Sequence, residues 1–210
     1  HLLSQAESEG ANIINRPSAL QKFNEKVFAL RFSHWMPDTN VICKEEDFKK
    51  FKEKYSTIIL KPLDGMGGES IYKFDESSKD HLTIFQSLTN NYQTMVMAQN
   101  FLPEIYNGDY RILLIHGKPF PIALARIPME GSFKGNLAAG GLGVARELSD
   151  DQMKASTEIG KLLLAEGIIF AGIDMIGNSL TEINITSPTG AREILSQTGR
   201  SPIQALLQSI

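Results

Sequence analysis

The sequence contains a single cysteine, Cys43, among its 210 residues, so a disulfide within the chain is excluded. Its four histidines are scattered and lack the short spacing of a zinc site. Long apolar runs are also missing. The longest, such as Ile112–Ile115 and Ile168–Phe170, are far shorter than the roughly 20 residues that span a bilayer. Neither a zinc site nor a membrane partner is therefore expected.

An excess of basic charge is missing as well. The chain has 21 Lys and Arg against 24 Asp and Glu, a net charge of −3, and no basic tract. Proteins that bind nucleic acids need a basic surface, because contacts with phosphates dominate their affinity. We therefore expect no nucleic-acid partner, and the short apolar runs lead us to expect a cytoplasmic protein.

The chain has no initiator Met, and its first ten residues are typical of the end of a helix. Leu2, Leu3 and Ala6 would share one side of that helix, and Gly10 would occupy the position at which helices end. We therefore expect that the chain begins inside a structural element.

The rest of the chain has enough apolar residues, 42%, to form a core. An amphipathic helix is expected from Pro17 to about Phe32, a hairpin around His116-Gly117-Lys118, and a long loop at Gly131–Gly143. Hairpin connections outnumber strict alternation of strand and helix, which favours an α+β fold. Further helices are expected at 45–55, 82–88, 149–167 and from 202, and strands at 41–42, 57–61, 70–74, 94–99, 110–115, 121–127, 168–175 and 180–185.

A glycine-rich segment, Lys61-Pro-Leu-Asp-Gly65-Met-Gly67-Gly68, lies between two expected strands. Closely spaced glycines let backbone N–H groups converge on an anion, and Lys61 adds a positive charge. The segment is neither a Walker A loop nor a Rossmann fingerprint. A plain hairpin loop is the alternative.

Three oxygen-bearing side chains meet on the last pair of strands. Glu182 and Asn184 are two residues apart and share a face, and a turn at 177–179 places Asp174 across from Glu182. Such a set suits Mg²⁺. A solvated polar face is the alternative.

Two arginines lie on apolar strands, Arg111 after Asp109 and Arg126 on the partner strand. They are either ordinary exposed strand residues or half-buried groups that need an anionic partner. A phosphate-binding loop, a metal site and buried arginines together indicate nucleotide-dependent phosphoryl or acyl chemistry.

In this order, the motifs resemble the ATP-grasp superfamily and, more closely, the prokaryotic glutathione synthetases. The resemblance runs from about Asn12 to the C-terminus. It is carried by Ile14-Asn-Arg-Pro17, Asn24-Glu-Lys26, Ile59 to Gly68, Ala98-Gln-Asn-Phe-Leu-Pro103, Gly108-Asp-Tyr-Arg111, Arg126-Ile-Pro128, Gly135 to Gly141, Gly172-Ile-Asp174 and Leu180 to Thr189. It implies an ATP-grasp fold, in which two α+β subdomains enclose ATP.

The resemblance also implies roles for individual residues. For ATP these are Lys26 and Lys61 at the phosphates, the loop glycines Gly65, Gly67 and Gly68, the adenine-pocket residues Gln99, Asn100 and Leu102, and Asp109 near the ribose. Asp174, Glu182 and Asn184 would hold Mg²⁺, with Mn²⁺ as the alternative. Arg111, Arg126 and Asn136 would be catalytic, and Arg126, Asn136, Ser187 and Thr189 would contact the peptide.

In this family the cysteinyl carboxylate of γ-glutamylcysteine attacks the γ-phosphate of ATP, and glycine then displaces phosphate from the acyl phosphate to form glutathione. A lid at Gly131–Gly143 would exclude water during this reaction. Leu142 and Lys134 stand where arginines are common in the family, so the lid is expected to contact substrate differently.

The resemblance further implies a domain before this region and a homo-oligomer at full length. We expect 1–20 to be the link from that domain, 21–98 the central subdomain, and 99–210 the C-terminal subdomain with the metal site and lid. Two alternatives remain: a fragment that binds ATP and Mg²⁺ without catalysis, and a ligase for a different carboxylate and amine.

Overall fold

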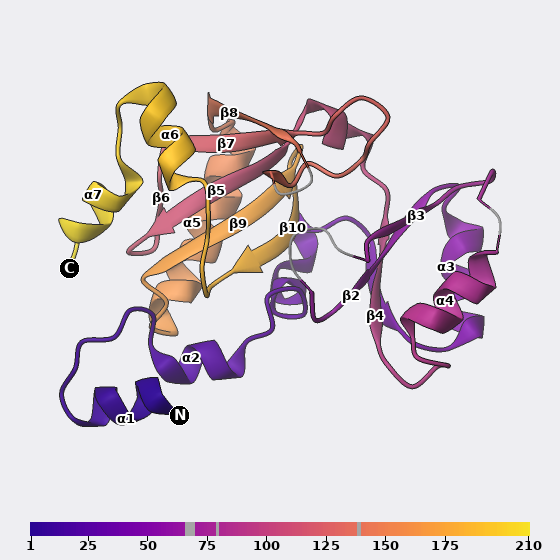
Figure 1. Cartoon of the computed structure of the whole chain (residues 1–210), viewed down its shortest axis with the longest axis horizontal. Coiled ribbons are helices and arrows are strands. Elements are labelled where there is room, and N and C mark those ends of the chain that lie inside the picture. Colours follow the sequence, from indigo (N-terminus) through magenta and orange to yellow (C-terminus); the bar gives the residue numbers. More distant parts are fainter. Residues whose placement is uncertain (66–69, 79, 138–139) are drawn as a thin grey trace.

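Two antiparallel sheets, each covered by helices, make up the molecule (Figure 1). The structure is a computed structural model and describes residues 1–65, 70–78, 80–137 and 140–210. No helix in these ranges is both long and apolar enough to cross a membrane. Mixed helices and antiparallel strands agree with the expected α+β class.

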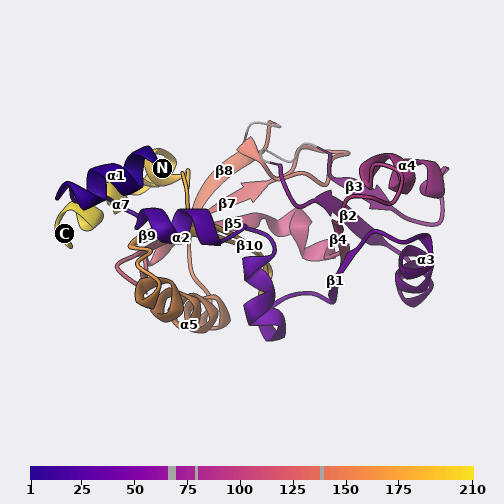
Figure 2. The same ribbon diagram turned by 90° about the horizontal axis from the view of Figure 1, so that it is seen from below.

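The smaller sheet has four strands in the order β1-β4-β2-β3, and the helices α3 and α4 pack against it (Figure 2). Its centre is aromatic, because Phe48 of α3 stacks on Phe85 of α4 and meets Phe74 of β3 edge-on. The elements are β1 (Thr39–Ile42), α3 (Glu45–Lys54), β2 (Ile58–Pro62), β3 (Tyr72–Phe74), α4 (His81–Leu88) and β4 (Val96–Asn100).

The larger sheet has six strands, with β10-β9-β5-β7-β8 in order and β6 paired to β5. Side chains alternate across it, so Ile112 and Leu114 of β5 face α5, whereas Leu113 and Ile115 face α6 and α7. The elements are η2 (Pro103–Asn107), β5 (Asp109–Ile115), β6 (Lys118–Pro119), β7 (Ile122–Ile127), β8 (Leu142–Glu147), α5 (Asp150–Ala165), β9 (Phe170–Ile176), β10 (Ser179–Asn184), α6 (Ala191–Thr198) and α7 (Pro202–Leu207).

Helix α5 begins and ends as the sequence predicts. Ser149 and Gln152 form a capping box, in which each side chain bonds the backbone N–H of the other residue. Gln152 also donates to the Gly177 carbonyl, 3.1 Å away, and so ties the helix to the β9–β10 turn. The chain leaves the helix at Gly167, whose φ of +83° suits glycine.

The prediction of one amphipathic helix from Pro17 to Phe32 is wrong. Helix α2 (Pro17–Lys22) ends at Phe23, which is extended, and a 3₁₀ helix, η1 (Phe28–Trp35), follows. Phe28 and Phe32 are buried in the core of the larger sheet, so the apolar spacing reflects tertiary packing. Before α2 lies the short helix α1 (Leu2–Ser8). The proposed subdomain boundaries stay predictions.

Asn15, just before α2, is buried and makes four hydrogen bonds with its side chain. The amide nitrogen donates to the carbonyls of Phe170 and Ile185 at 2.6 and 2.7 Å. The amide oxygen accepts from the N–H groups of Ile169 and Phe170 at 2.8 Å each. This one side chain therefore fastens the start of β9 to the residue that follows β10.

Two elements near the expected lid were not predicted. Strand β8 continues directly from the loop, and α6 packs on it. The Gln197 side chain of α6 accepts from the Ala145 N–H at 2.8 Å and donates to the Gly143 carbonyl at 3.0 Å. A side-chain amide thus makes the bonds that a further strand would make with the edge strand β8.

Candidate functional site

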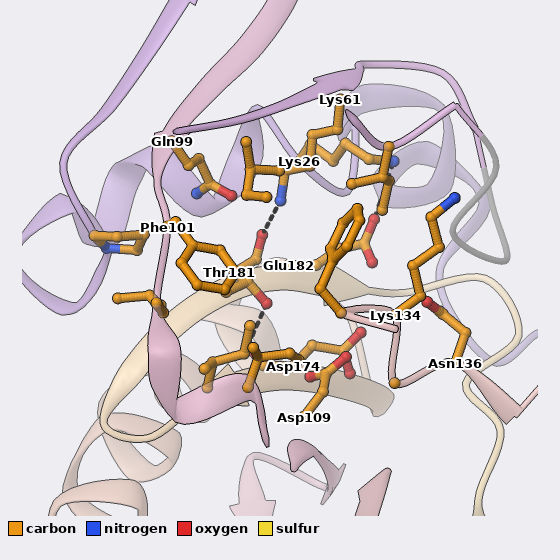
Figure 3. Close-up of a pocket in the computed structure, with 18 of the residues that line it drawn as sticks. Lys26, Lys61, Gln99, Phe101, Asp109, Lys134, Asn136, Asp174, Thr181 and Glu182 are labelled. Carbon is orange, nitrogen blue, oxygen red and sulfur yellow. Dashed lines mark hydrogen bonds and ion pairs between the residues drawn. The ribbon is translucent and has the colours of Figure 1, made fainter. Parts of the chain in front are cut away.

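A cleft lies between the two sheets, with an empty volume of about 950 Å³ that includes the solvent at its mouth. This is enough room for a ligand of nucleotide size. Figure 3 shows charged and polar side chains from both sheets pointing into it. Its apolar lining comes from both sheets and the chain near them, and consists of Ile59, Ile71, Phe101, Leu102, Ile105 and Ile176.

Lys61, near the end of β2, is buried in this cleft. Its Nζ donates to the Thr181 carbonyl of β10 at 3.0 Å, so it already bridges the two sheets. Burial lowers the pKa of Lys61 to about 8, although the nearby Glu182 carboxylate opposes this change. A lysine held in this way has a strong tendency to take an anionic partner.

Lys26 provides a second buried ammonium group. Its Nζ lies 3.0 Å from Glu182 Oε1 and donates to the Gly65 carbonyl at 2.8 Å. Its neighbour Asn24 accepts from the N–H groups of Lys26 and Val27 and donates to the Leu63 carbonyl at 3.2 Å. The 24–26 segment therefore contacts the glycine-rich segment.

The predicted metal ligands do come together. Glu182 and Asp174 are opposed in the β9–β10 register, and Asn184 Nδ2 lies 3.2 Å from Asp174 Oδ2. No group of three or more His, Cys, Asp or Glu side chains able to hold a metal occurs in the described part of the chain. A site here therefore depends on the amide oxygen of Asn184. Two carboxylates and an amide suit a hard divalent cation.

Both predicted arginines lie beside this group, behind the wall of the cleft. Arg111 bonds both oxygens of Asp174, at 2.5 and 2.9 Å. Arg126 Nη2 lies 2.5 Å from Asp109 Oδ2 and 3.1 Å from Asp174 Oδ2. All four charged side chains are buried or nearly so, and neither arginine lines the cleft.

The two aspartates titrate differently because their partners differ. Burial alone would raise the pKa of Asp174, but the charges of Arg111 and Arg126 outweigh it and hold that pKa below its usual range. Burial raises the pKa of Asp109 to about 6, against the lowering effect of Arg126. Asp109 Oδ1 is buried without a hydrogen-bond partner among the described residues, and Asp109 lines the cleft.

The remaining predicted residues are placed in three ways. Gln99, Asn100, Leu102, Gly65 and Asn136 line the cleft. Ser187 and Thr189 do not, but Arg111 Nη1 donates to Thr189 Oγ1 at 3.4 Å. Gly67 and Gly68 lie outside the described residues.

The loop that carries Asn136 packs tightly against β7. A Cβ on Gly135 would lie 2.4 Å from the Arg126 carbonyl oxygen, and one on Gly141 would lie 2.3 Å from the Gly135 carbonyl oxygen. Glycine is required at both positions because the backbones come so close. Lys134 from this loop also lines the cleft, while Leu142 is 65% exposed.

Several residues of the site were not predicted. Phe101, Ile105 and Ile176 belong to the apolar lining of the cleft, and Thr181 supplies a carbonyl to Lys61. In the sequence, only their proximity to predicted site residues could have indicated that they line the site. Apolar residues near a strand end are equally typical of a core, so their type does not distinguish the two.

The comparisons of this sequence with known proteins agree on one family. The family model for "Prokaryotic glutathione synthetase, ATP-grasp domain" matches residues 25–199. A glutathione synthetase from Vibrio parahaemolyticus is 49% identical over 194 residues, covering 92% of this chain and 61% of the relative. One from Nitrosomonas europaea is 46% identical over 214 residues, covering 100% and 67%. The chain thus spans about two thirds or less of these relatives' length.

Solved structures agree on the fold. D-cycloserine synthetase DcsG matches with a TM-score of 0.68 at 15% identity, covering 96% of this chain and 73% of that one. A D-alanine–D-alanine ligase from Bacillus anthracis matches with a TM-score of 0.67 at 13% identity, covering 98% and 73%. The ATP-grasp ligase PsnB matches with a TM-score of 0.67 at 18% identity, covering 97% and 63%. At such identities these likenesses bear on the fold alone.

Proposed function

Because this chain belongs to the prokaryotic glutathione synthetase family and contains its ATP-grasp domain, we propose that it joins γ-L-glutamyl-L-cysteine to glycine. ATP would be converted to ADP and phosphate, through an acyl phosphate on the cysteinyl carboxylate. The observation that carries this proposal is the meeting of two buried lysines with Asp174 and Glu182 in one cleft between two sheets, with Asn184 bonded to Asp174.

Different parts of the cleft would bind the base, the ribose and the phosphates of ATP. The apolar lining around Phe101 and Ile176 suits a flat base, and Gln99, Asn100 and Leu102, which also line the cleft, would bind the adenine edge. Asp109, whose Oδ1 has no partner in the part of the chain that the structure describes, would accept a hydrogen bond from the ribose. Lys26 and Lys61 would exchange their protein acceptors for phosphate oxygens, with Gly65, Gly67 and Gly68 beside them.

Asp174, Glu182 and Asn184 would hold Mg²⁺, or Mn²⁺ as the alternative, because their oxygens match the preference of these hard ions. When bound, the ion would neutralise phosphate charge that otherwise repels the incoming carboxylate. Arg111 and Arg126 fix Asp174 in place and add positive charge behind it. Asn136, Ser187, Thr189 and Arg126 would contact the peptide.

The most direct test mixes the protein with ATP, Mg²⁺, γ-glutamylcysteine and glycine and measures ADP and glutathione. We expect both products in equal amounts, and neither when γ-glutamylcysteine is omitted. Calorimetric binding of ATP and Mg²⁺ without any turnover would reduce the function to nucleotide binding. Turnover with another acid and amine from a substrate panel, but not with this pair, would contradict the proposal.

Two further expectations belong to the same proposal. The reaction would take place in the cytoplasm, where fractionation with an antibody can locate the protein. The full-length protein would be a homo-oligomer, which light scattering at several concentrations can measure.

A further inference from the structure

Two N–H groups point away from the larger sheet at its β10 edge, that of Ile183 in β10 and that of Ile185, which directly follows the strand. Both residues are buried, at 0% and 1% exposure. Water therefore cannot readily satisfy these donors, and leaving them unpaired would cost free energy. A partner from elsewhere in the chain is required.

Glu25 is that partner at both positions. Its backbone carbonyl accepts from the Ile183 N–H at 3.1 Å, and its side-chain Oε1 accepts from the Ile185 N–H at 3.2 Å. One residue thus supplies two acceptors along the edge of the strand. This explains why α2 ends at Lys22: the chain must run beside β10 before η1 begins.

Lys26 follows directly, and its position depends on how its neighbour is held. Its side chain is only 7% exposed and reaches both Glu182 on β10 and Gly65 on the other side of the cleft. Glu182 is itself one residue from Ile183, to which Glu25 is bonded. The bonds of Glu25 therefore set the distance between Lys26 and the strand that carries Glu182 and Asn184.

We propose that Glu25 is a positioning residue for ATP binding, acting through Lys26. The proposal rests on the function proposed above, in which Lys26 binds ATP phosphates. Glu25 itself would not touch the nucleotide. Its role is to hold the Lys26 backbone against β10, so that the ammonium group meets phosphate and the acidic cluster in a fixed geometry.

Two conservative substitutions separate this role from an effect of charge. Glu25→Gln keeps an Oε1 acceptor of the same reach and removes the charge, whereas Glu25→Asp keeps the charge and shortens the side chain by one methylene. We expect Glu25→Gln to bind ATP, with Mg²⁺ present, within about twofold of wild type. Glu25→Asp should bind about tenfold more weakly, the effect of losing one hydrogen bond. The opposite order would overturn the proposal in favour of a charge effect.

The link to Lys26 is tested by a double-mutant cycle read out as ATP dissociation constants from calorimetry. In a Lys26→Met background, Glu25→Asp should have no further effect. An undiminished loss there would overturn the proposal, since Glu25 would then act independently of Lys26.

A matched control comes from the opposite edge of the same sheet. Gln197→Met removes the side chain that pairs with the edge of β8, far along the sheet from Lys26. It should lower the melting temperature and leave ATP affinity unchanged. An equal loss of ATP affinity in Gln197→Met would mean that loosening either edge suffices, and Glu25 would have no special position. If wild type binds no ATP, the proposed function fails instead.

Discussion

Arg111 donates two parallel hydrogen bonds to Asp174, from Nε to Oδ1 at 2.5 Å and from Nη2 to Oδ2 at 2.9 Å. The two residues are direct partners in the β5–β9 register, so the strand pairing itself aligns them. Gly172 makes room for this pair, because a Cβ there would lie 2.8 Å from Arg111 Cδ. The first proposed metal ligand is thus fixed before any ligand arrives.

Glu182→Gln tests the acidic cluster. The amide keeps the shape of the side chain and accepts a hydrogen bond from Lys26, but its neutral oxygen attracts Mg²⁺ less strongly than a carboxylate does. We expect the Mg²⁺ concentration for half-maximal turnover to rise about tenfold or more, with a melting temperature within about 2 °C of wild type.

The control is Glu147→Gln, the same chemical change at an exposed position on β8. It should alter neither quantity. A loss of stability in Glu182→Gln that matches its loss of activity would point to a structural role for the carboxylate.

Lys61→Met tests whether the buried charge of Lys61 lowers the stability of the folded protein. Its pKa, lowered by burial to about 8, lies below that of an unfolded lysine, near 10.5. Below pH 8 the burial penalty is fully present; between pH 8 and 10.5 the unfolded chain binds more protons, so wild-type stability rises with pH. Lys61→Met removes the burial penalty but also the hydrogen bond to Thr181, so we expect a net rise in the free energy of unfolding of about 1–2 kcal/mol at pH 7. The same change should abolish ATP binding.

Chemical denaturation at pH 7 and pH 10 measures this effect. The advantage of the variant should shrink at pH 10, where the penalty has largely gone. An advantage of the same size at both pH values would show that it comes from apolar packing rather than from charge.

Gly160→Ala in α5 should lower the free energy of unfolding, the opposite of what this change usually does in a helix. In a helix interior this change normally stabilises by about 1 kcal/mol. Here the added Cβ would lie 2.3 Å from the Gly117 carbonyl oxygen, so α5 and the β5–β6 turn would have to separate. We expect a loss of about 2 kcal/mol, measured by chemical denaturation.

Ser156→Ala, one turn earlier in α5, is the matched control. Its Oγ is buried without a partner among the described residues, so removing it should be neutral or stabilising. A gain in stability from Gly160→Ala would mean that the contact with Gly117 yields easily.

Asn15→Asp tests the bond network that fastens β9 to the end of β10. The aspartate cannot donate to the carbonyls of Phe170 and Ile185, and it buries a negative charge beside them. We expect a loss of about 3 kcal/mol in the free energy of unfolding, larger at pH 7 than at pH 4. Asn90→Asp, at an exposed position, should change it by less than about 0.5 kcal/mol. Equal effects of the two changes would contradict the assigned role of Asn15.

Local pattern predicted the parts of the site that depend on a single hairpin. The sequence predicted that Glu182 faces Asp174, and this pairing is found, but the expected three-residue turn at 177–179 is wrong. Ser179 already pairs with Ile176, so the turn is Gly177-Asn178, and a register shift between Leu180 and Glu182 restores the pairing with Asp174. The buried arginines were left open between two interpretations, because sequence alone does not show what lies across from a strand. The register supplies the answer for Arg111.

Tertiary contacts explain what the sequence did not predict. Apolar spacing from Leu20 to Leu30 indicated one helix, but the polar residues 24–26 bond β10 and the glycine-rich segment instead. Strand β8 was missed because it is half exposed, and Gly143 weakens its pattern. Helix α6 was missed because it starts after Gly190 without a side-chain cap.

Unpaired strand edges are where sheets of different molecules join and begin to aggregate. In the six-stranded sheet, part of each outer edge is already bonded: Glu25 accepts from the N–H groups of Ile183 and Ile185 beside β10, and Gln197 pairs with Gly143 and Ala145 of β8. A strand from another copy could pair at these positions only by displacing Glu25 or Gln197. These two residues therefore protect the larger sheet against edge-to-edge aggregation, without the lysines or prolines that often serve this purpose.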